Sequence, residues 1–321
     1  MDISIVIVNY NSWNVLKECI QSILSLHTAV AIETIVVDNC SPKDLLTTYQ
    51  EKYPSVLWIK NSGNNGFANG CNFGAKHAKG SYLFFLNPDT QIQEGVLEHF
   101  LEIYTKEDIG LLSCIQSNKK GGIHKYHLLF PTAMRTFGVL RSIERKINNH
   151  KHKIQFKETE TRCYPDWISG SAVFVSSSNF KAIGQWNEDY WMYFEDVDLS
   201  KKAQLQGLDV VVTKEVSIFH LHGGSSRINP KTKAITKSEV IKSRHTYISN
   251  YFTKRENSYL HFVLFIGYVV SIGLLAMLSI PFFFIKKLQV NRFKAIELYS
   301  YYKHVYTNKT WLSERSMNLK S

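Results

Sequence analysis

Short apolar runs alternate with helical patterns through the first third of the chain. The runs are Ile3–Val8, Ile35–Val37, Val56–Ile59 and Tyr82–Leu86, and later ones follow at Trp167–Val175, Asp209–Val212 and Val216–His220. Between the first two runs, apolar residues recur every three or four positions from Val15 to Leu24, which predicts an amphipathic helix behind an Asn11-Ser12 cap. Strands that alternate with helices predict an α/β fold, with a mostly parallel sheet covered by helices on both faces.

Polar side chains stand where three of these predicted strands end, at Asn9, Asp38 and Asp89. Ligands of such sheets bind beyond the carboxyl ends of the strands, so the three residues are predicted to share a site. A carboxylate there can accept a hydrogen bond from a base or a ribose, or hold Mg²⁺ or Mn²⁺ against a diphosphate. The Asn65-Gly66 turn adds backbone N–H groups at a helix start, which suits phosphate. Either aspartate alone is more often a turn or cap residue, so the prediction depends on the whole set.

Two further polar clusters lie in the second half of the chain. Glu195 and Asp196 open a predicted helix directly after Trp191–Phe194, which are all large and apolar. Acidic residues are common in a first helical turn because of the helix dipole, but beside an aromatic pocket they also suit a general base. His220 and His222 lie two apart on a predicted strand and therefore point the same way. Either histidine is a candidate ligand for a metal or a phosphate, or a structural side chain.

Residues 260–285 contain no Asp, Glu, Lys or Arg and form the longest apolar stretch. This length is sufficient to cross a bilayer once, with some tilt. Both flanks are basic, with Lys254 and Arg255 before and Lys286 and Lys287 after, so the positive-inside rule gives no orientation. A single span, an interfacial helix and a re-entrant segment all remain open, and a buried core helix is the alternative. The sequence favours membrane association.

The net charge of +11, from 38 Lys and Arg against 27 Asp and Glu, indicates anionic partners. The basic residues are dense between about 117 and 160, where Met134, Phe137, Leu140 and Ile143 recur at helical spacing. Such a helix can lie on a membrane surface or pack against the main domain. No recognition-helix or zinc pattern supports binding of nucleic acid. The five cysteines are scattered without a CxxC pair, which fits a reducing compartment.

The loop after the first predicted strand argues against two other nucleotide-binding classes. A dehydrogenase needs G-x-G-x-x-G at this position, and a nucleotidyltransferase needs a glycine-rich loop with Arg or Lys. The sequence here is Asn9-Tyr10-Asn11-Ser12, which is neither.

The ordered set of motifs resembles family 2 glycosyltransferases, most closely the rhamnosyltransferase-like branch of bacterial polysaccharide biosynthesis. The segments that carry the resemblance cover roughly residues 3–226 in the family's order: Val6–Asn11, Val36–Asn39, Asn65–Ala68, Phe85–Thr90, Trp167–Ser171, Met192–Leu199 and His222–Ser225. The resemblance implies the nucleotide-diphospho-sugar transferase fold of GT-A type, which is Rossmann-like. Asn87 departs from the general pattern, because it replaces the first Asp of an Asp-x-Asp motif.

The resemblance also implies roles for individual residues. It assigns Asp38 to the nucleobase or the ribose, and Gly170 and Ser171 to the sugar pocket. Asn9, Asn65 and Gly66 are the further nucleotide-binding candidates, from their positions at a strand end and a helix start. Asp89 is implied as the ligand of Mg²⁺ or Mn²⁺, with His222 as a candidate second ligand. Asp196 is implied as the catalytic base, with Glu195 supporting it.

The predicted activity is that of an inverting glycosyltransferase of class EC 2.4. It is expected to move a sugar, rhamnose being favoured, from a dTDP- or UDP-sugar to a lipid-linked glycan at the cytoplasmic face of the cell membrane. A transferase that uses a UDP-hexose and a catalytically inactive membrane scaffold are the alternatives. The predicted organisation is a catalytic domain at 1–226 with a basic insert at about 117–160, a helical linker at 227–259, a membrane segment at 260–285 and a basic tail at 286–321.

Overall fold

The computed structural model describes residues 1–118, 120–132, 156–221, 229–282 and 284–319. They form two compact units, and each is described by itself. The first contains the described residues of Met1–Phe130, Ile154–Asn187 and Glu195–Ser225, and the second those of Pro131–Lys153, Glu188–Phe194 and Ser226–Ser321. The predicted basic helix around Met134–Ile143 and the candidate ligand His222 lie outside the described residues.

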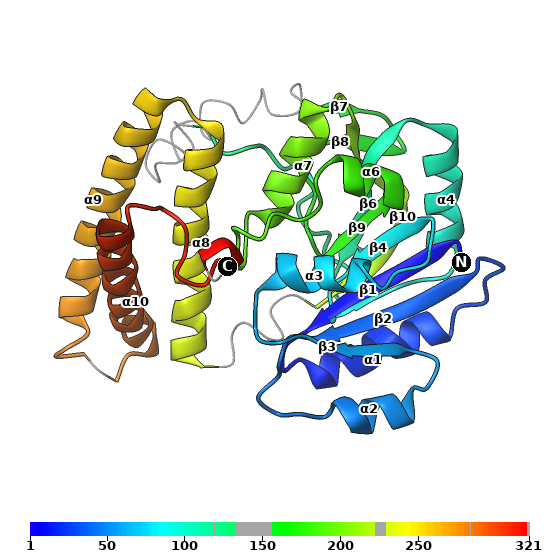
Figure 1. Ribbon diagram of the computed structural model, residues 1–321, viewed down its shortest axis with the longest axis horizontal. Coiled ribbons are helices and arrows are strands. Elements are labelled where there is room, and N and C mark those ends of the chain that lie inside the picture. The colour runs from blue at the N-terminus through cyan, green and yellow to red at the C-terminus, as the bar shows by residue number, and fades with distance from the viewer. Residues whose placement is uncertain (119, 133–155, 222–228, 283, 320–321) are drawn as a thin grey trace. The chain divides into compact units, whose positions relative to one another are not determined.

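The first unit is an α/β unit (Figure 1). Its elements are β1 (Ile3–Asn9), α1 (Trp13–Leu24), β2 (Ile32–Asp38), α2 (Leu46–Lys52), β3 (Leu57–Lys60), α3 (Phe67–Ala75), β4 (Tyr82–Leu86), β5 (Thr90–Gln91), α4 (Val96–Lys106), β6 (Ile109–Ser117), β7 (Lys157–Glu158), β8 (Arg162–Tyr164), β9 (Ala172–Ser176), α6 (Ser177–Ala182), α7 (Glu195–Leu205) and β10 (Asp209–His220). The described strands form one ten-stranded sheet in the order β3-β2-β1-β4-β9-β6-β10-β8-β7, with β5 paired to β10.

Strand direction divides this sheet into two kinds of pairing. Strands β3, β2, β1 and β4 are parallel neighbours, and β10 is parallel to β6. Strand β9 runs antiparallel to both β4 and β6, and β8 and β7 extend the sheet with antiparallel pairs. The predicted α/β fold is therefore confirmed, with an antiparallel β9 inserted into a sheet whose larger strands are mostly parallel.

Both faces of the sheet are covered by helices, as the sequence predicted. On β1, Ile3 and Ile7 pack on one face with residues of α1 and α4, while Val6 and Val8 pack on the other with residues of α3 and α7. Successive side chains of a strand point to opposite faces, so the fully apolar run of β1 supplies two cores at once.

Glycines let α3 lie close to the sheet. A Cβ at Gly70 would lie 2.7 Å from Val8 Cγ1, and one at Gly74 would lie 2.4 Å from Val6 Cγ1. These contacts show that α3 runs antiparallel to β1 and that its N-terminus lies at the carboxyl end of that strand. The helix begins after Gly66, whose φ of 92° is in the region that favours glycine.

Three local expectations need correction. The two strands expected at Asp209–Val212 and Val216–His220 are one strand, β10, with a register shift against β6 between Thr213 and Ser217. The shift accommodates the three residues between Thr213 and Ser217 without ending the strand. Ser12 is the N-cap residue of α1, but its hydroxyl donates to the Tyr10 carbonyl instead of capping the helix. The strand expected at Trp167–Val175 begins only at Ala172.

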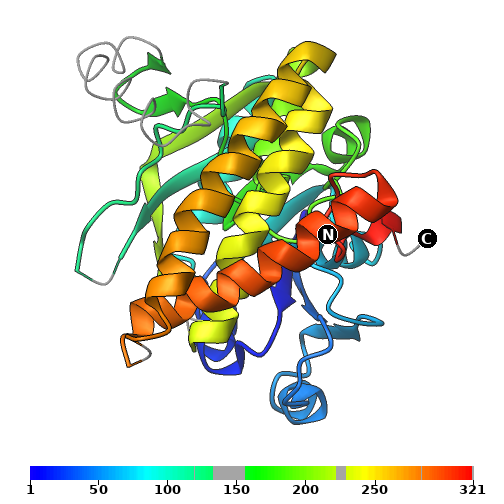
Figure 2. The ribbon, with the colours of Figure 1, turned by 90° about the vertical axis from the view of Figure 1, so that its left-hand side faces the viewer.

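The second unit is helical. It contains α8 (Pro230–Tyr251), α9 (Lys254–Leu278), α10 (Lys286–Asn308) and a short 3₁₀ helix (Met317–Leu319). Figure 2 shows α8 and α9 side by side, with α10 crossing them. Helix α9 begins with a capping box between Thr253 and Glu256 and ends at Leu278, so the apolar stretch leaves the helix before Pro281. By length and composition α9 can cross a membrane, and only 22% of its most apolar window is buried.

Candidate active site

Two adjacent carboxyl groups open helix α7. Asp196 Oδ2 accepts a hydrogen bond from the Gly170 backbone N–H at 3.1 Å, and Oδ1 accepts one from the Val197 N–H at 2.9 Å. Glu195 is only 6% exposed, and its Oε2 has no hydrogen-bond partner among the described residues. Asp196 is partly exposed. The Asp196 carboxyl group is thus oriented by two backbone donors, while Glu195 is enclosed with one oxygen unbonded among the described residues.

Burial changes the acidity of both groups. It raises the pKa of Asp196 to about 6, although the hydrogen bonds from Gly170 and Val197 oppose this change. Burial also raises the pKa of Glu195 well above its usual range, and the nearby charge of Asp196 adds to the effect. Of the two carboxyl groups, Asp196 is therefore the one more readily ionised near neutral pH. One turn further along α7, Asp198 has Lys202 at 3.3 Å.

A second set of polar contacts joins Asp89 to the sugar-site residues. Asp89 Oδ1 lies 3.3 Å from His220 Nε2, at the end of β10. The other ring nitrogen of His220, Nδ1, lies 2.8 Å from Gln116 Oε1, which also accepts a hydrogen bond from the Ser171 hydroxyl at 2.8 Å. Because Ser171 follows Gly170 directly, this path leads from Asp89 to the amide that binds Asp196.

The donor set around Asp89 fits a divalent cation. Gln116 Oε1 is an acceptor, so His220 donates from Nδ1, and in the neutral imidazole its Nε2 lone pair then faces the Asp89 carboxylate. A divalent cation held by Nε2 and the carboxylate would relieve the repulsion between these two electron-rich atoms. An imidazole nitrogen and a carboxylate oxygen are both ligands of Mn²⁺ and related ions. His220 is therefore the histidine that the structure places at Asp89.

The ends of β1 and β2 are joined through the carboxylate of Asp38. Its Oδ1 accepts hydrogen bonds from Asn9 Nδ2 at 2.9 Å and from the Ser41 hydroxyl at 2.5 Å. Its Oδ2 accepts from the Ser41 backbone N–H at 3.0 Å. Asn9 and Asp38 are both fully buried. Both residues shape the predicted nucleotide end of the site, and direct contact with a nucleotide stays a prediction.

The start of α3 contacts residues beside both Asp38 and Asp196. The Gly66 carbonyl accepts a hydrogen bond from Asn39 Nδ2 at 2.8 Å. A Cβ added to Gly170 would lie 3.3 Å from the Phe67 ring and 3.5 Å from Asp196 Cβ. Gly170 thus lies between the first residue of α3 and Asp196. Asn65, whose side chain donates to Ser62 Oγ at 3.2 Å, precedes the same turn.

Sequence reasoning missed Gln116 and Ser41. Gln116 lies near the carboxyl end of β6, a strand that is not among those the sequence predicts. Ser41 follows Asp38 by three residues, and the Asp-x-x-Ser spacing is a common local turn whose hydrogen bonds are a readable signal. Of the predicted residues, only His222 lies outside the described part of the chain.

Solved structures share this fold. A crystal structure of TarS 1–349 from S. aureus in complex with UDP matches with a TM-score of 0.53 and 16% identity, covering 97% of this chain and 92% of that one. GalNAc-T7 with UDP, GalNAc and Mn²⁺ matches with a TM-score of 0.53 and 15% identity, covering 69% and 43%. The fold is that of the GT-A-like nucleotide-sugar glycosyltransferases.

Comparison of the amino-acid sequence with known protein families identifies the family of this chain. Residues 4–169, just over half of the 321, match the model for glycosyl transferase family 2, and the chain belongs to this family. It is 26% identical over 224 residues to the low-salt glycan biosynthesis hexosyltransferase Agl10 of Haloferax volcanii, covering 68% of this chain and 67% of Agl10. It is 26% identical over 186 residues to the rhamnosyltransferase WbbL of Escherichia coli, covering 54% and 67%.

A third relative is the N-acetylglucosaminyl-diphospho-decaprenol L-rhamnosyltransferase of Mycobacterium tuberculosis. It is 23% identical over 224 residues, which cover 64% of this chain and 72% of the relative. The chain is therefore a nucleotide-sugar glycosyltransferase of glycan biosynthesis, and its relatives include both hexosyl- and rhamnosyltransferases.

Proposed function

We propose that the chain is an inverting glycosyltransferase in which Asp196 is the general base. The observation that supports this role is a partly exposed carboxyl group whose pKa burial raises to about 6, beside Glu195, whose pKa burial also raises. A base with a pKa just below the working pH is largely ionised and still accepts a proton well.

The chemistry is a single displacement. The acceptor hydroxyl loses its proton to Asp196 as its oxygen forms a bond to the anomeric carbon. The bond from that carbon to the diphosphate breaks on the opposite face, so the configuration inverts. No covalent nucleophile is required. Gly170 and Ser171 line the sugar pocket in this proposal, because Gly170 donates its N–H to the base.

The donor diphosphate is held from two sides in this proposal. Asn9, Asp38, Asn65 and Gly66 face the nucleotide at the carboxyl ends of β1 and β2 and the start of α3. Asp89 and His220 would hold Mg²⁺ or Mn²⁺, with His222 a further candidate from the resemblance. A divalent cation supplies charge stabilisation to a leaving diphosphate, and the GalNAc-T7 structure contains Mn²⁺ with UDP.

The relatives support a donor and an acceptor class. Two relatives are rhamnosyltransferases, which favours dTDP-rhamnose, while Agl10 is a hexosyltransferase and TarS 1–349 has been solved with UDP-GlcNAc, which keeps UDP-hexoses as the second candidate. The mycobacterial relative is named for a diphospho-decaprenol acceptor, which supports a lipid-linked glycan here. The exposed apolar side chains of α9 and of the residues that follow it support attachment through 260–285 to the cytoplasmic face of the membrane.

The test is a donor screen with the full chain in mild detergent. We expect release of dTDP or UDP from one donor only when Mg²⁺ or Mn²⁺ and a polyprenyl-diphosphate-linked glycan are present. Asp89→Ala should abolish the metal dependence and most of the release. Donor binding by calorimetry separates the possible failures: binding without turnover points to a wrong acceptor, whereas loss of all donor binding supports the inactive-scaffold alternative.

A further inference from the structure

We propose that the C-terminal segment, residues 311–319, is a positioning element for the catalytic base. In the second unit it contacts Glu188–Phe194, which is called the lead-in segment here because the chain passes from Phe194 directly into Glu195 and Asp196. The C-terminal segment and α8 hold the lead-in segment in one conformation and so fix where α7 begins. This inference rests on the proposed role of Asp196.

The C-terminal segment contacts the first half of the lead-in segment. The contacts are a hydrogen bond from the Met317 N–H to the Glu188 carbonyl at 3.3 Å, one from Asn318 Nδ2 to Asp189 Oδ1 at 2.7 Å, and the Arg315 guanidinium over the Trp191 ring at 5.5 Å. They combine a backbone bond, a side-chain bond and a cation–π contact, so they define both the position and the direction of the segment.

Helix α8 contacts the second half. The contacts are a hydrogen bond from the Ser243 hydroxyl to the Met192 carbonyl at 2.9 Å, one from Asn250 Nδ2 to the Tyr190 hydroxyl at 3.4 Å, and packing of the Phe194 and Tyr247 rings with centroids 5.6 Å apart. The last of these contacts is made by the residue next to Glu195.

The lead-in segment needs such support because its backbone is strained. Tyr193 and Phe194 have φ angles of 70° and 69°, in the left-handed region that is unfavourable for side chains with a Cβ. Two consecutive aromatic residues keep this conformation only where their surroundings impose it, and strain of this kind clusters at functional sites. Release of the segment would change the start of α7 and therefore the direction of the Asp196 carboxylate.

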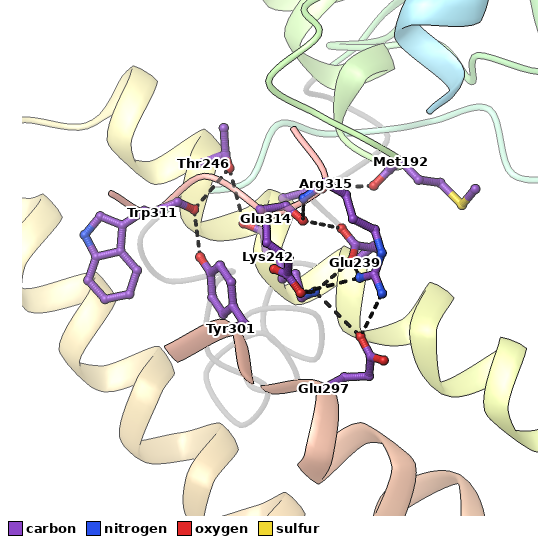
Figure 3. A network of polar contacts seen from close by, with 11 residues as sticks. Met192, Glu239, Lys242, Thr246, Glu297, Tyr301, Trp311, Glu314 and Arg315 are labelled. Atoms are coloured by element: carbon purple, nitrogen blue, oxygen red, sulfur yellow. Dashed lines mark hydrogen bonds and ion pairs between the residues drawn. The ribbon is translucent and has the colours of Figure 1, made fainter. Parts of the chain in front are cut away.

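The C-terminal segment is itself fixed by a buried ion network (Figure 3). Lys242 of α8 is fully buried, with Nζ 2.9 Å from Glu239 Oε1 and 2.7 Å from Glu314 Oε1. Arg315 lies 2.6 Å from Glu239 Oε1 and 3.1 Å from Glu297 Oε2 of α10. Since loss of one member leaves a buried charge without its partner, the network joins α8, α10 and the C-terminal segment as one structure.

The experiment compares three proteins purified in mild detergent: the full wild-type chain, a chain truncated after Ser313, and the full chain with Arg315→Met. For both variants we expect kcat to fall about 10²-fold while the KM for the donor stays within about twofold, because small misplacement of a catalytic group costs rate more than binding. Amide hydrogen exchange in residues 188–194 should become faster. Lys303→Met, which removes an exposed cation from α10, is the matched control and should change neither measurement.

Rescue separates positioning from general destabilisation. Arg315→Lys retains a cation beside Glu239 and Trp191 and should recover much of the kcat lost in Arg315→Met, as should a synthetic peptide of residues 309–321 added to the truncated chain. If the truncated chain does not fold, the Ser243→Ala and Asn318→Ala pair removes one bond from each side and should still lower kcat without changing donor KM.

Two results would overturn the inference: unchanged exchange in residues 188–194, or faster exchange with an unchanged kcat. Absence of turnover in the wild type with every donor is a different result, because hydrogen exchange does not depend on turnover. That result would overturn the proposed function, and the C-terminal segment would then have no catalytic base to position.

Discussion

Each unit of the chain contains an acidic cluster built around a buried glutamate, Glu195 in the first and Glu239 in the second, but only Glu239 is paired with cations among the described residues. In the second unit, Glu239 and Glu314 are paired with Lys242 and Arg315. Burial opposes ionisation of Glu314, but Lys242 holds its pKa below the usual range. In the first unit burial raises the pKa of Asp196 to about 6, and no described cation is paired with it.

The contrast shows that burial alone does not identify a catalytic carboxyl group. A buried acid that is paired with a cation has a structural role, because the cation already stabilises its ionised form. Asp38 is a third case, since it is fully buried but accepts three hydrogen bonds from Asn9 and Ser41. Among the described acidic residues, the Glu195–Asp196 pair combines burial, an unbonded Glu195 oxygen and raised pKa values, which is the combination expected of an acid–base group.

The largest expected effect comes from removing the unmatched charge. Asp196→Asn keeps the shape of the side chain but removes the base, so turnover should fall by about 10²–10⁴-fold. Nucleotide binding, measured by calorimetry, should remain nearly intact. Asp209→Asn makes the same chemical change at an exposed position at the start of β10 and should leave turnover unchanged. Near-normal turnover in Asp196→Asn would show that another group accepts the proton.

Removing the cation from the Glu239–Glu314 cluster of the second unit should lower the stability of the fold. Lys242→Met leaves Glu239 and Glu314 without their shared cation, and we expect the free energy of unfolding to fall by about 3–5 kcal/mol. Denaturant titration in detergent measures this loss. Lys237→Met, on an exposed position of the same helix, should stay within about 0.5 kcal/mol of wild type. Equal stability of the two variants would mean that the network contributes nothing to the fold.

The first unit was the more predictable of the two. Its strands are apolar over most of their length, and Asn9, Asp38 and Asp89 interrupt that pattern where the strands end. A local pattern of this kind is readable without a structure. The helix start at Glu195 and Asp196 is predicted in the same way, because the two acids follow a run of large apolar residues, and the role of Asp196 as base stays a prediction.

The remaining contacts depend on packing between distant segments. Gln116 and His220 meet although 104 residues separate them, and β6 with its Gln116 was not recognised. Lys242 and Glu314 are 72 residues apart, and nothing in the mixed polar and apolar sequence of α8 marks Lys242 as fully buried. Charge pairing over such distances follows from tertiary structure, which periodicity does not encode.

The pH dependence of turnover tests whether the pKa of Asp196 is raised in the working enzyme. Asp196 acts in its ionised form, so kcat/KM should be constant above its pKa of about 6 and fall tenfold per pH unit below it. A steady-state pH profile between about pH 4.5 and 8 covers this range. Donor binding followed over the same range excludes a change at the nucleotide end of the site. A midpoint near the ordinary aspartate value of about 3.9 would mean that burial does not raise the pKa of the working base.

The smallest expected effect is a gain in stability from removing the enclosed carboxyl group. The pKa of Glu195 is higher in the folded chain than in the unfolded chain, so this group favours folding at low pH, and its contribution is lost as pH rises through the folded-state pKa. The glutamine of Glu195→Gln cannot ionise. The free energy of unfolding of this variant should therefore exceed that of wild type by about 0.5–2 kcal/mol at pH 8, with a smaller difference at pH 5. Thermal melting of both forms at the two pH values measures the difference. A Glu195→Gln chain that is less stable than wild type at pH 8 would mean that the ionised carboxylate is compensated in the native state, and the contrast with the Lys242 cluster would no longer hold.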